Sequence, residues 1–387
     1  MKKNYLLNVL VLCCGLFVCT IARAESDKDE PSNTKSEVAQ VNNDDLTKQV
    51  NKLLSILPKF SGYIQTGYNW GDKNGDNRSS FQLKRMRLII DKKVSKTFDF
   101  RAQLECFSGS VDNSAYKKKV ITVMDAFVNA HITDALHFRA GQYYLPLGFE
   151  NYDISPSTLE TVDFSNICYR MVCRNAISSA DLIDLGVMAY GDLFKSKDQK
   201  FSYLSYQLSL TNGYLPTLND DNKSKDFVGR ITIRPVEKLR IIGCYNWGEY
   251  KGTVNDESFN YQPMNRVIVG AWYNDPKGLD LRAEYGHIGS SKDGRDIIKE
   301  DGFYALAGWH AGKFLPVVRY DFYRDKVNDS SLNNYDRILL GLTYNPCNHV
   351  KIQANYCHSF YTDKAKEISN NGKRGSDQIQ LMGVFYF

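Results

Sequence analysis

The chain ends on the stretch QIQLMGVFYF, residues 378–387, and the alternation in this stretch carries the first information about the fold. Successive side chains of a β-strand point to opposite faces of the sheet. Ile379, Leu381, Phe385 and Phe387 would therefore share one apolar face. Because chain ends usually fray in water, a strand that finishes on an aromatic residue indicates an end held at a lipid–water boundary.

The first 24 residues have the three parts of a secretory signal peptide. Lys2 and Lys3 precede an apolar core from about residue 5 to residue 21, and Ala22-Arg23-Ala24 forms a small-residue cleavage site. An uncleaved membrane anchor is the alternative, because the core is about as long as the shortest membrane-spanning helices. The cleavage site therefore favours the signal peptide, which would comprise residues 1–24, and it predicts that the protein is exported.

From residue 59 to residue 387, strand-like segments alternate with polar connections. In LKRMRLII (83–90), for example, Met86, Leu88 and Ile90 alternate with Arg85 and Arg87. We count about 16 such segments, and an even number is typical of bacterial outer-membrane barrels. Short connections such as TDAL (133–136) and NDPKG (274–278) alternate with long ones such as GYLPTLNDDNKSKD (213–226).

This segregation of loop lengths favours a membrane barrel over a soluble β-sandwich, which has no reason to separate short turns from long loops. No apolar stretch after the signal peptide is long enough to span a bilayer as a helix. In lipid, only helices and closed barrels satisfy every backbone polar group. The sequence therefore predicts an all-β fold, a transmembrane antiparallel β-barrel of about 16 strands, in the outer membrane of a Gram-negative-type bacterium.

Residues 25–58 form a separate periplasmic leader in this interpretation. Its first part is polar and poor in aromatic residues. Four apolar residues then follow the four-three-four spacing of a coiled-coil seam before Pro58: Leu46, Val50, Leu53 and Leu57. Two roles stay open for this short amphipathic helix over 42–57: it could add to the association of three chains, or it could lie against the base of the barrel.

One connection, residues 147–181, is long and has no strand period. A structureless segment of this length in a compact fold is usually functional or disordered, and its apolar residues argue against disorder: Phe149, Ile154, Leu159, Phe164 and Met171. We expect this third outer loop to fold inward and narrow the pore, with Arg170 and Arg174 near the narrowest point. Cys168 and Cys173 lie in the same loop. The sequence does not decide whether they form a local disulfide or remain two free thiols.

Side chains on the inward face would set the selectivity of such a channel, because a barrel of about sixteen strands encloses water rather than a packed core. Guanidinium groups that line a pore favour anions. The alternation predicts these inward bases: Arg85, Arg87, Arg101, Arg139, Arg230, Arg234, Arg319, Arg337 and Lys351. It also predicts these inward acids, which could neutralise the bases instead: Asp99, Glu105, Asp125, Glu284 and Asp321.

Several motifs, in this order, resemble the phosphate-selective porin O and P family over nearly all of residues 60–387. They are LKRMRL (83–88), DAFVNAHITDALHFRAGQYYLPLGFEN (125–151), LIDLGVMAYGDLF (182–194), YQLSLTNG (206–213), DFVGRITIRP (226–235), DGFYALAGW (301–309) and VVRYDFY (317–323). The resemblance implies a sixteen-stranded trimeric channel with an inward-folded third loop. It also implies a ladder of basic residues that leads to a central anion site.

The same resemblance assigns candidate residues to the central site. Lys84 and Arg85 match the paired basic residues of the family's second strand, and Asp125 matches the acid of the DA motif. Asn151 stands where phosphate-selective members have a lysine, so the site would carry one positive charge fewer. Strict alternation turns Lys84 and Arg85 to opposite faces unless the strand bulges there, which makes Arg85 the stronger candidate.

The predicted function is thus an outer-membrane porin, a passive diffusion channel for small anionic or hydrophilic solutes, with phosphate as a candidate. The alternatives are a solute-specific, sugar-type channel and a phospholipase-like barrel enzyme. No G-x-S-x-G, H-E-x-x-H, P-loop or G-x-G-x-x-G motif occurs, so we expect no enzyme activity, no cofactor and no metal site. The expected partners are two further copies in a homotrimer, outer-membrane lipid, small solutes and the outer-membrane assembly machinery, but no nucleic acid.

Overall fold

The computed structural model of the chain describes residues 57–73, 76–108, 121–172, 182–213, 224–254, 257–369 and 372–387. Residues 57–387 form one compact unit. The predicted signal peptide and the leader up to residue 56 lie outside the described residues, so both stay predictions. Among the residues that are described, no helix is long and apolar enough to cross a membrane.

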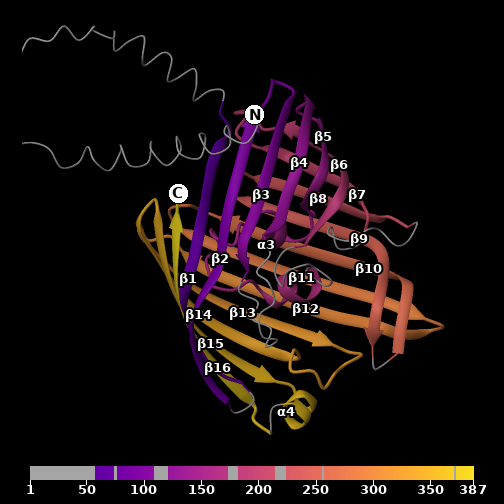
Figure 1. Cartoon of the computed structure of the whole chain (residues 1–387), viewed down its shortest axis with the longest axis vertical. Helices are drawn as coiled ribbons and strands as arrows, with labels where there is room; N and C mark the ends of the chain where they lie inside the picture. The colour runs from indigo at the N-terminus through magenta and orange to yellow at the C-terminus, as the bar shows by residue number, and fades with distance from the viewer. Residues whose placement is uncertain are drawn as a thin grey trace, which may run out of the picture. The chain divides into compact units, whose positions relative to one another are not determined.

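Sixteen antiparallel strands close into one barrel (Figure 1). Each strand pairs with its neighbours in sequence, and β1 pairs with β16. The first eight strands are β1 (Lys59–Lys73), β2 (Asp76–Lys93), β3 (Phe98–Ser108), β4 (Thr122–Thr133), β5 (Leu136–Tyr144), β6 (Ile183–Lys195), β7 (Ser202–Thr211) and β8 (Asp226–Val236). The other eight are β9 (Leu239–Val254), β10 (Glu257–Asn274), β11 (Leu279–Lys292), β12 (Arg295–Trp309), β13 (Phe314–Asp325), β14 (Tyr335–Cys347), β15 (Val350–Tyr361) and β16 (Gly375–Tyr386). The predicted fold class is confirmed.

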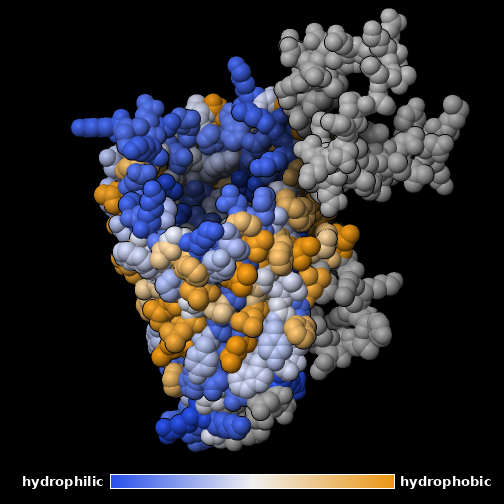
Figure 2. Space-filling view, turned by 90° about the vertical axis from the view of Figure 1, so that its left-hand side faces the viewer, coloured by the Kyte–Doolittle hydropathy of each residue, from blue (hydrophilic) through white to orange (hydrophobic). Residues whose placement is uncertain are grey.

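The strands carry apolar side chains on the outside and polar ones on the inside. In β8, Phe227, Ile231 and Ile233 are exposed, whereas Arg230 and Thr232 are buried. Figure 2 shows apolar side chains on the outer wall of the barrel, with hydrophilic residues toward its two ends. This arrangement reverses that of a soluble protein, and it suits a wall that faces lipid and a lumen that holds water.

The last strand, β16, has the apolar outer face that the sequence predicts for it. Ile379, Leu381, Phe385 and Phe387 are all exposed on the outer face. The backbone N–H of Phe387 donates to the carbonyl of Gly62 at 3.1 Å, and the N–H of Gly62 donates back to the Phe387 carbonyl at 3.0 Å. Phe387 is therefore hydrogen-bonded into the seam between β1 and β16 that closes the barrel.

Between β5 and β6, the third outer loop includes two short helical turns, α3 (Phe149–Tyr152) and η1 (Ile167–Val172). The five apolar residues noted in the sequence are all buried: Phe149, Ile154, Leu159, Phe164 and Met171. They belong to one cluster with inward-facing side chains such as Ile268, Ile288 and Leu306. In Figure 1 the loop is drawn within the ring of strands, and these contacts place it against the inner wall. A further helix, α4 (Asp363–Ser369), lies in the last outer loop.

Strand β2 bulges at Lys84. Gln65 of β1 pairs with Arg85 and the next residue, Thr66, pairs with Leu83, so Lys84 has no partner position of its own. An extra residue in one strand shifts the alternation that follows it. Both Lys84 and Arg85 consequently make inward contacts, Lys84 with the third loop and Arg85 with Gln65. The bulge removes the reason for preferring Arg85 over Lys84 as an inward residue.

We expect replacement of Gly141 by alanine to destabilise the barrel. Gly141 has φ 127°, and a Cβ there would lie 2.2 Å from the carbonyl oxygen of Ala126. Such backbone strain costs about 1–3 kcal/mol before the clash is counted. Gly243→Ala is the matched control, because nothing lies within 4 Å of its added Cβ. Urea unfolding, followed by gel mobility without boiling, should show a lower midpoint for Gly141→Ala only; equal midpoints would contradict the strain argument.

Candidate functional site

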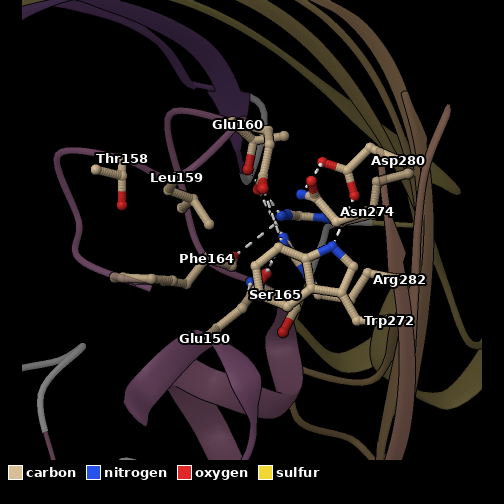
Figure 3. Close-up of polar contacts among 12 residues, drawn as sticks. Glu150, Thr158, Leu159, Glu160, Phe164, Ser165, Trp272, Asn274, Asp280 and Arg282 are labelled. Atoms are coloured by element: carbon tan, nitrogen blue, oxygen red, sulfur yellow. Dashed lines mark hydrogen bonds and ion pairs between the residues drawn. The ribbon is translucent and has the colours of Figure 1, made fainter. Parts of the chain in front are cut away.

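A buried ion pair joins the third loop to the barrel wall. Arg282 of β11 donates from its two terminal nitrogens to the two oxygens of Glu160 in the loop, at 2.9 and 2.7 Å (Figure 3). Its Nε donates to the hydroxyl of Tyr304 at 3.0 Å, and Glu150 of α3 lies 3.6 Å away. The Arg282 side chain is fully buried. A buried charge is strongly unfavourable unless it is paired, so we expect this ion pair to be a main attachment of the loop to β11.

Other inward bases hold the backbone of the same loop. Arg319 of β13 donates to the hydroxyl of Thr161 at 3.0 Å and to the carbonyl of Asp163 at 2.9 Å. Lys351 of β15 donates to the carbonyl of Leu159 at 2.8 Å. These cations donate hydrogen bonds to loop carbonyls that would otherwise be buried without partners. Their role is therefore to hold the loop backbone against the barrel wall.

Lys84 serves the loop in the same way. Its ammonium pairs with the carboxylate of Asp163 and donates to the carbonyl of Val162 at 2.7 Å. Burial by itself would raise the pKa of Asp163, but Lys84, with a further hydrogen bond from Gln380, holds this pKa well below its usual range. Asp163 is thus ionised at neutral pH, and its negative charge neutralises the positive charge of Lys84.

A second group of arginines is attached to the third loop weakly or not at all. Arg139 of β5 and Arg234 of β8 have no carboxylate within 4 Å among the described residues; Arg139 donates to the amide oxygen of Asn129 and lies 3.9 Å from the ring centre of Phe127. The Nε of Arg234 is buried without a hydrogen-bond partner in the described part of the chain. Arg240 of β9 lies 4.0 Å from the ring centre of Trp272 and 3.7 Å from Asp153.

Three arginines on β8 and β9 line one cavity of about 210 Å³: Arg230, Arg234 and Arg240. We call these three residues the basic patch. Arg230 is fully engaged, because it donates to Asp153 at 2.5 Å and to the carbonyl of Gly148 at 2.9 Å. Arg240 is engaged more loosely, 3.7 Å from Asp153, and Arg234 has no carboxylate within 4 Å among the described residues.

Of the other predicted bases, Arg87 and Arg101 have carboxylate partners, whereas Arg337 has a hydroxyl partner. Arg87 pairs with Glu105 at 2.7 Å, and Arg101 pairs with Asp91 at 2.7 and 3.1 Å. Arg337 donates to the hydroxyl of Ser359 at 3.0 Å. Asp125 is buried on β4. For Arg87 and Arg101, the geometry fits the alternative in which inward arginines and acids neutralise each other.

Two of the residues that the sequence predicts at the constriction, Asn151 and Arg170, differ in their hydrogen bonding. The side-chain amide of Asn151 donates to the carbonyl of Leu145 at 2.9 Å and accepts from the N–H of Leu182 at 2.9 Å, so it ties together the two ends of the loop. Arg170 lies half-buried in η1, and its Nε makes no hydrogen bond within the described residues.

Arg174 and Cys173 lie outside the described residues, and Cys168 is buried. Whether Cys168 and Cys173 form a disulfide or remain two free thiols is therefore not tested.

Sequence reasoning missed Arg240, Arg282, Asp153 and Glu160. Arg240 and Arg282 share the inward parity of their strands, so the alternation that found Arg230 could have found both. Asp153 and Glu160 lie in the loop, where no period indicates which side chains approach the wall.

Comparison with known proteins places the chain among porins. The family model described as phosphate-selective porin O and P matches residues 61–387. No curated protein sequence matches significantly. An anion-selective porin from Comamonas acidovorans superposes with a TM-score of 0.62 at 14% identity, covering 85% of this chain and 99% of that one.

Two further solved structures have the same fold. The trimer form of OmpT, an outer-membrane protein of Vibrio cholerae, has a TM-score of 0.56 at 13% identity, with 85% of this chain and 99% of that chain covered. OmpF of Salmonella typhi, solved with daunomycin, has a TM-score of 0.63 at 13% identity, with 85% and 97% covered. At these identities the structural likeness shows the fold alone.

We expect Arg282→Gln to loosen the third loop, because Glu160 is left as a buried charge without its partner, at a cost of about 3–5 kcal/mol. Single-channel recordings should show a larger or noisier conductance. Arg337→Gln is the control, because it removes the same charge from the inner wall at a side chain hydrogen-bonded to Ser359. Equal conductance in both variants and the wild type would mean that the ion pair does not hold the loop.

Proposed function

Because the chain belongs to the phosphate-selective porin O and P family and is thus an outer-membrane diffusion channel, we propose that it passes small anions in preference to cations, with phosphate as a candidate solute. The observation that carries the proposal is the division of the inward arginines into two groups. Arg282 and Arg319 are engaged by the third loop. Arg234 and Arg139 have no carboxylate within reach among the described residues, and Arg240 has only Asp153, which Arg230 holds more closely.

The magnitude of this free charge is sufficient to select ions. One unit charge at ~5 Å from an ion in water contributes ~0.8 kcal/mol, or roughly a fourfold change in local concentration. Charges within a Debye length of about 8 Å reinforce one another. Arginines that no carboxylate neutralises would therefore raise the local concentration of anions.

Phosphate selectivity needs more than a general anion preference. Asn151 stands where the family resemblance would place a lysine of the central site. Its side-chain amide is hydrogen-bonded to the backbone of Leu145 and Leu182. Lys84 is occupied by Asp163. In this proposal Arg139, Arg234 and Arg240 supply the anion preference in place of these two positions, and Arg85 and Asp125 are secondary contributors.

The proposal includes a homotrimer exported by a signal peptide over residues 1–24 and inserted by the outer-membrane assembly machinery. One neighbour in fold is described as a trimer, and the exposed apolar wall of the barrel offers lipid and subunit contacts. Family and fold both indicate a channel rather than an enzyme.

The test is the zero-current potential of the purified protein in a planar bilayer under a KCl gradient. We expect anion preference in the wild type, and a permeability ratio lower by about fourfold per charge removed in Arg234→Gln and Arg240→Gln. Lys238→Gln makes the same charge change in the β8–β9 turn, where Lys238 pairs with Asp275, and should leave the ratio unchanged. A wild type without preference, or one that prefers cations, would refute the proposal.

Phosphate is tested in the same bilayer. If phosphate is a selected solute, its addition should reduce the chloride current with a saturating concentration dependence, and Arg234→Gln should weaken this block. Anion preference without block would leave a general anion channel and would remove phosphate from the candidate solutes.

A further inference from the structure

The cavity beside the basic patch combines charge with aromatic faces and neutral polar groups. It has a volume of about 210 Å³ and opens on the inner wall between β5 and β9, at the start of the third loop. That volume is well above the ~30 Å³ share of one water molecule and below the ~300–1,000 Å³ of pockets for drug-sized ligands. A small organic solute fits this range.

The charged part of the lining leaves one positive charge in excess. Three arginines line the cavity against Asp153 and Asp192. Asp153 is held by Arg230 at 2.5 Å, and Asp192 accepts a hydrogen bond from the hydroxyl of Ser205 at 2.5 Å. Arg234 therefore remains without a carboxylate, and an anionic group of a solute would be its partner.

The aromatic part of the lining is supported by a chain of side-chain contacts. Tyr190 of β6 stacks on His137 with ring centres 5.0 Å apart and planes 29° apart. His137 contacts His131 through their Nδ1 atoms at 3.0 Å, and the Nε2 of His131 contacts Asp99 at 2.6 Å. This chain of contacts fixes the ring of Tyr190, which is the kind of support that a preformed binding site needs. Tyr152 of α3 also lines the cavity.

A neutral polar group completes the lining. Gln207 of β7 lines the cavity, and its amide oxygen is buried without a hydrogen-bond partner among the described residues. A buried amide left unpaired is unfavourable, so it indicates a partner that is supplied by water or by a solute. An inorganic anion such as chloride offers that oxygen no donor, whereas a hydroxyl group does.

We propose that this cavity binds a small hydroxylated organic anion of the sugar-phosphate type during its passage through the channel. The anionic group faces Arg234 and Arg240, the carbon skeleton lies against Tyr190, and a hydroxyl group donates to Gln207. A neutral sugar would leave the arginines unused, and inorganic phosphate would leave the aromatic faces unused. The inference rests on the proposed anion preference and narrows its solute class.

Block of single-channel current by glucose 6-phosphate, inorganic phosphate and glucose tests this inference. A bound solute obstructs the lumen, so we expect half-block by glucose 6-phosphate at a concentration several-fold lower than for either other compound. Tyr190→Leu and Gln207→Leu should each raise that concentration about fivefold, which is within the range for one lost contact. Neither substitution changes a charge, so the zero-current potential should stay as in the wild type.

Tyr245→Leu is the matched control. Tyr245 of β9 lies on the outer face, where its hydroxyl donates to Asn265 at 2.6 Å, so its replacement should not affect block. Equal block by all three compounds, or block unaffected by Tyr190→Leu and Gln207→Leu, would overturn the binding site while leaving the anion preference intact. Block by glucose 6-phosphate that depends on both residues in a channel without anion preference would support the site and refute only the proposed selectivity.

Discussion

The ion pair between Arg282 and Glu160 is the interaction on which the interior of this protein depends. Both groups are buried, and each would be strongly unfavourable alone. Their bidentate contact attaches the third loop to β11, and Arg319, Lys351 and Lys84 bind the loop's backbone and the carboxylate of Asp163. Arg234 and Arg240 line a cavity of about 210 Å³, to which Tyr152 and Asp153 of the same loop also contribute.

The inward arginines therefore fall into two groups, those that are paired within the protein and those that are not. Counting inward charges treats every arginine alike, yet most of these arginines are neutralised or hydrogen-bonded within the protein. Arg87 and Arg101 pair with Glu105 and Asp91, whereas Arg234 has no such partner among the described residues. Arg234 and Arg240, two of the less engaged arginines, adjoin the cavity lined by Tyr190 and Gln207.

The candidate site was predictable in part. Alternation found Arg139, Arg230 and Arg234 because strand parity decides which side chains face inward. It could not say which of them are available, since that depends on pairing across strands and with the loop. The bulge at Lys84 shows the same limit, because one inserted residue turns a side chain inward that strict alternation would turn outward.

The sequence by itself determined the barrel, its strand number and the two faces of each strand, because lipid outside and water inside impose a period of two on every strand. It also determined that residues 147–181 must bury apolar side chains. Only the tertiary structure decided where that loop binds and which arginines remain free. The physical reason is that ion pairs such as Arg282–Glu160 join residues more than a hundred positions apart, and no local pattern records such a contact.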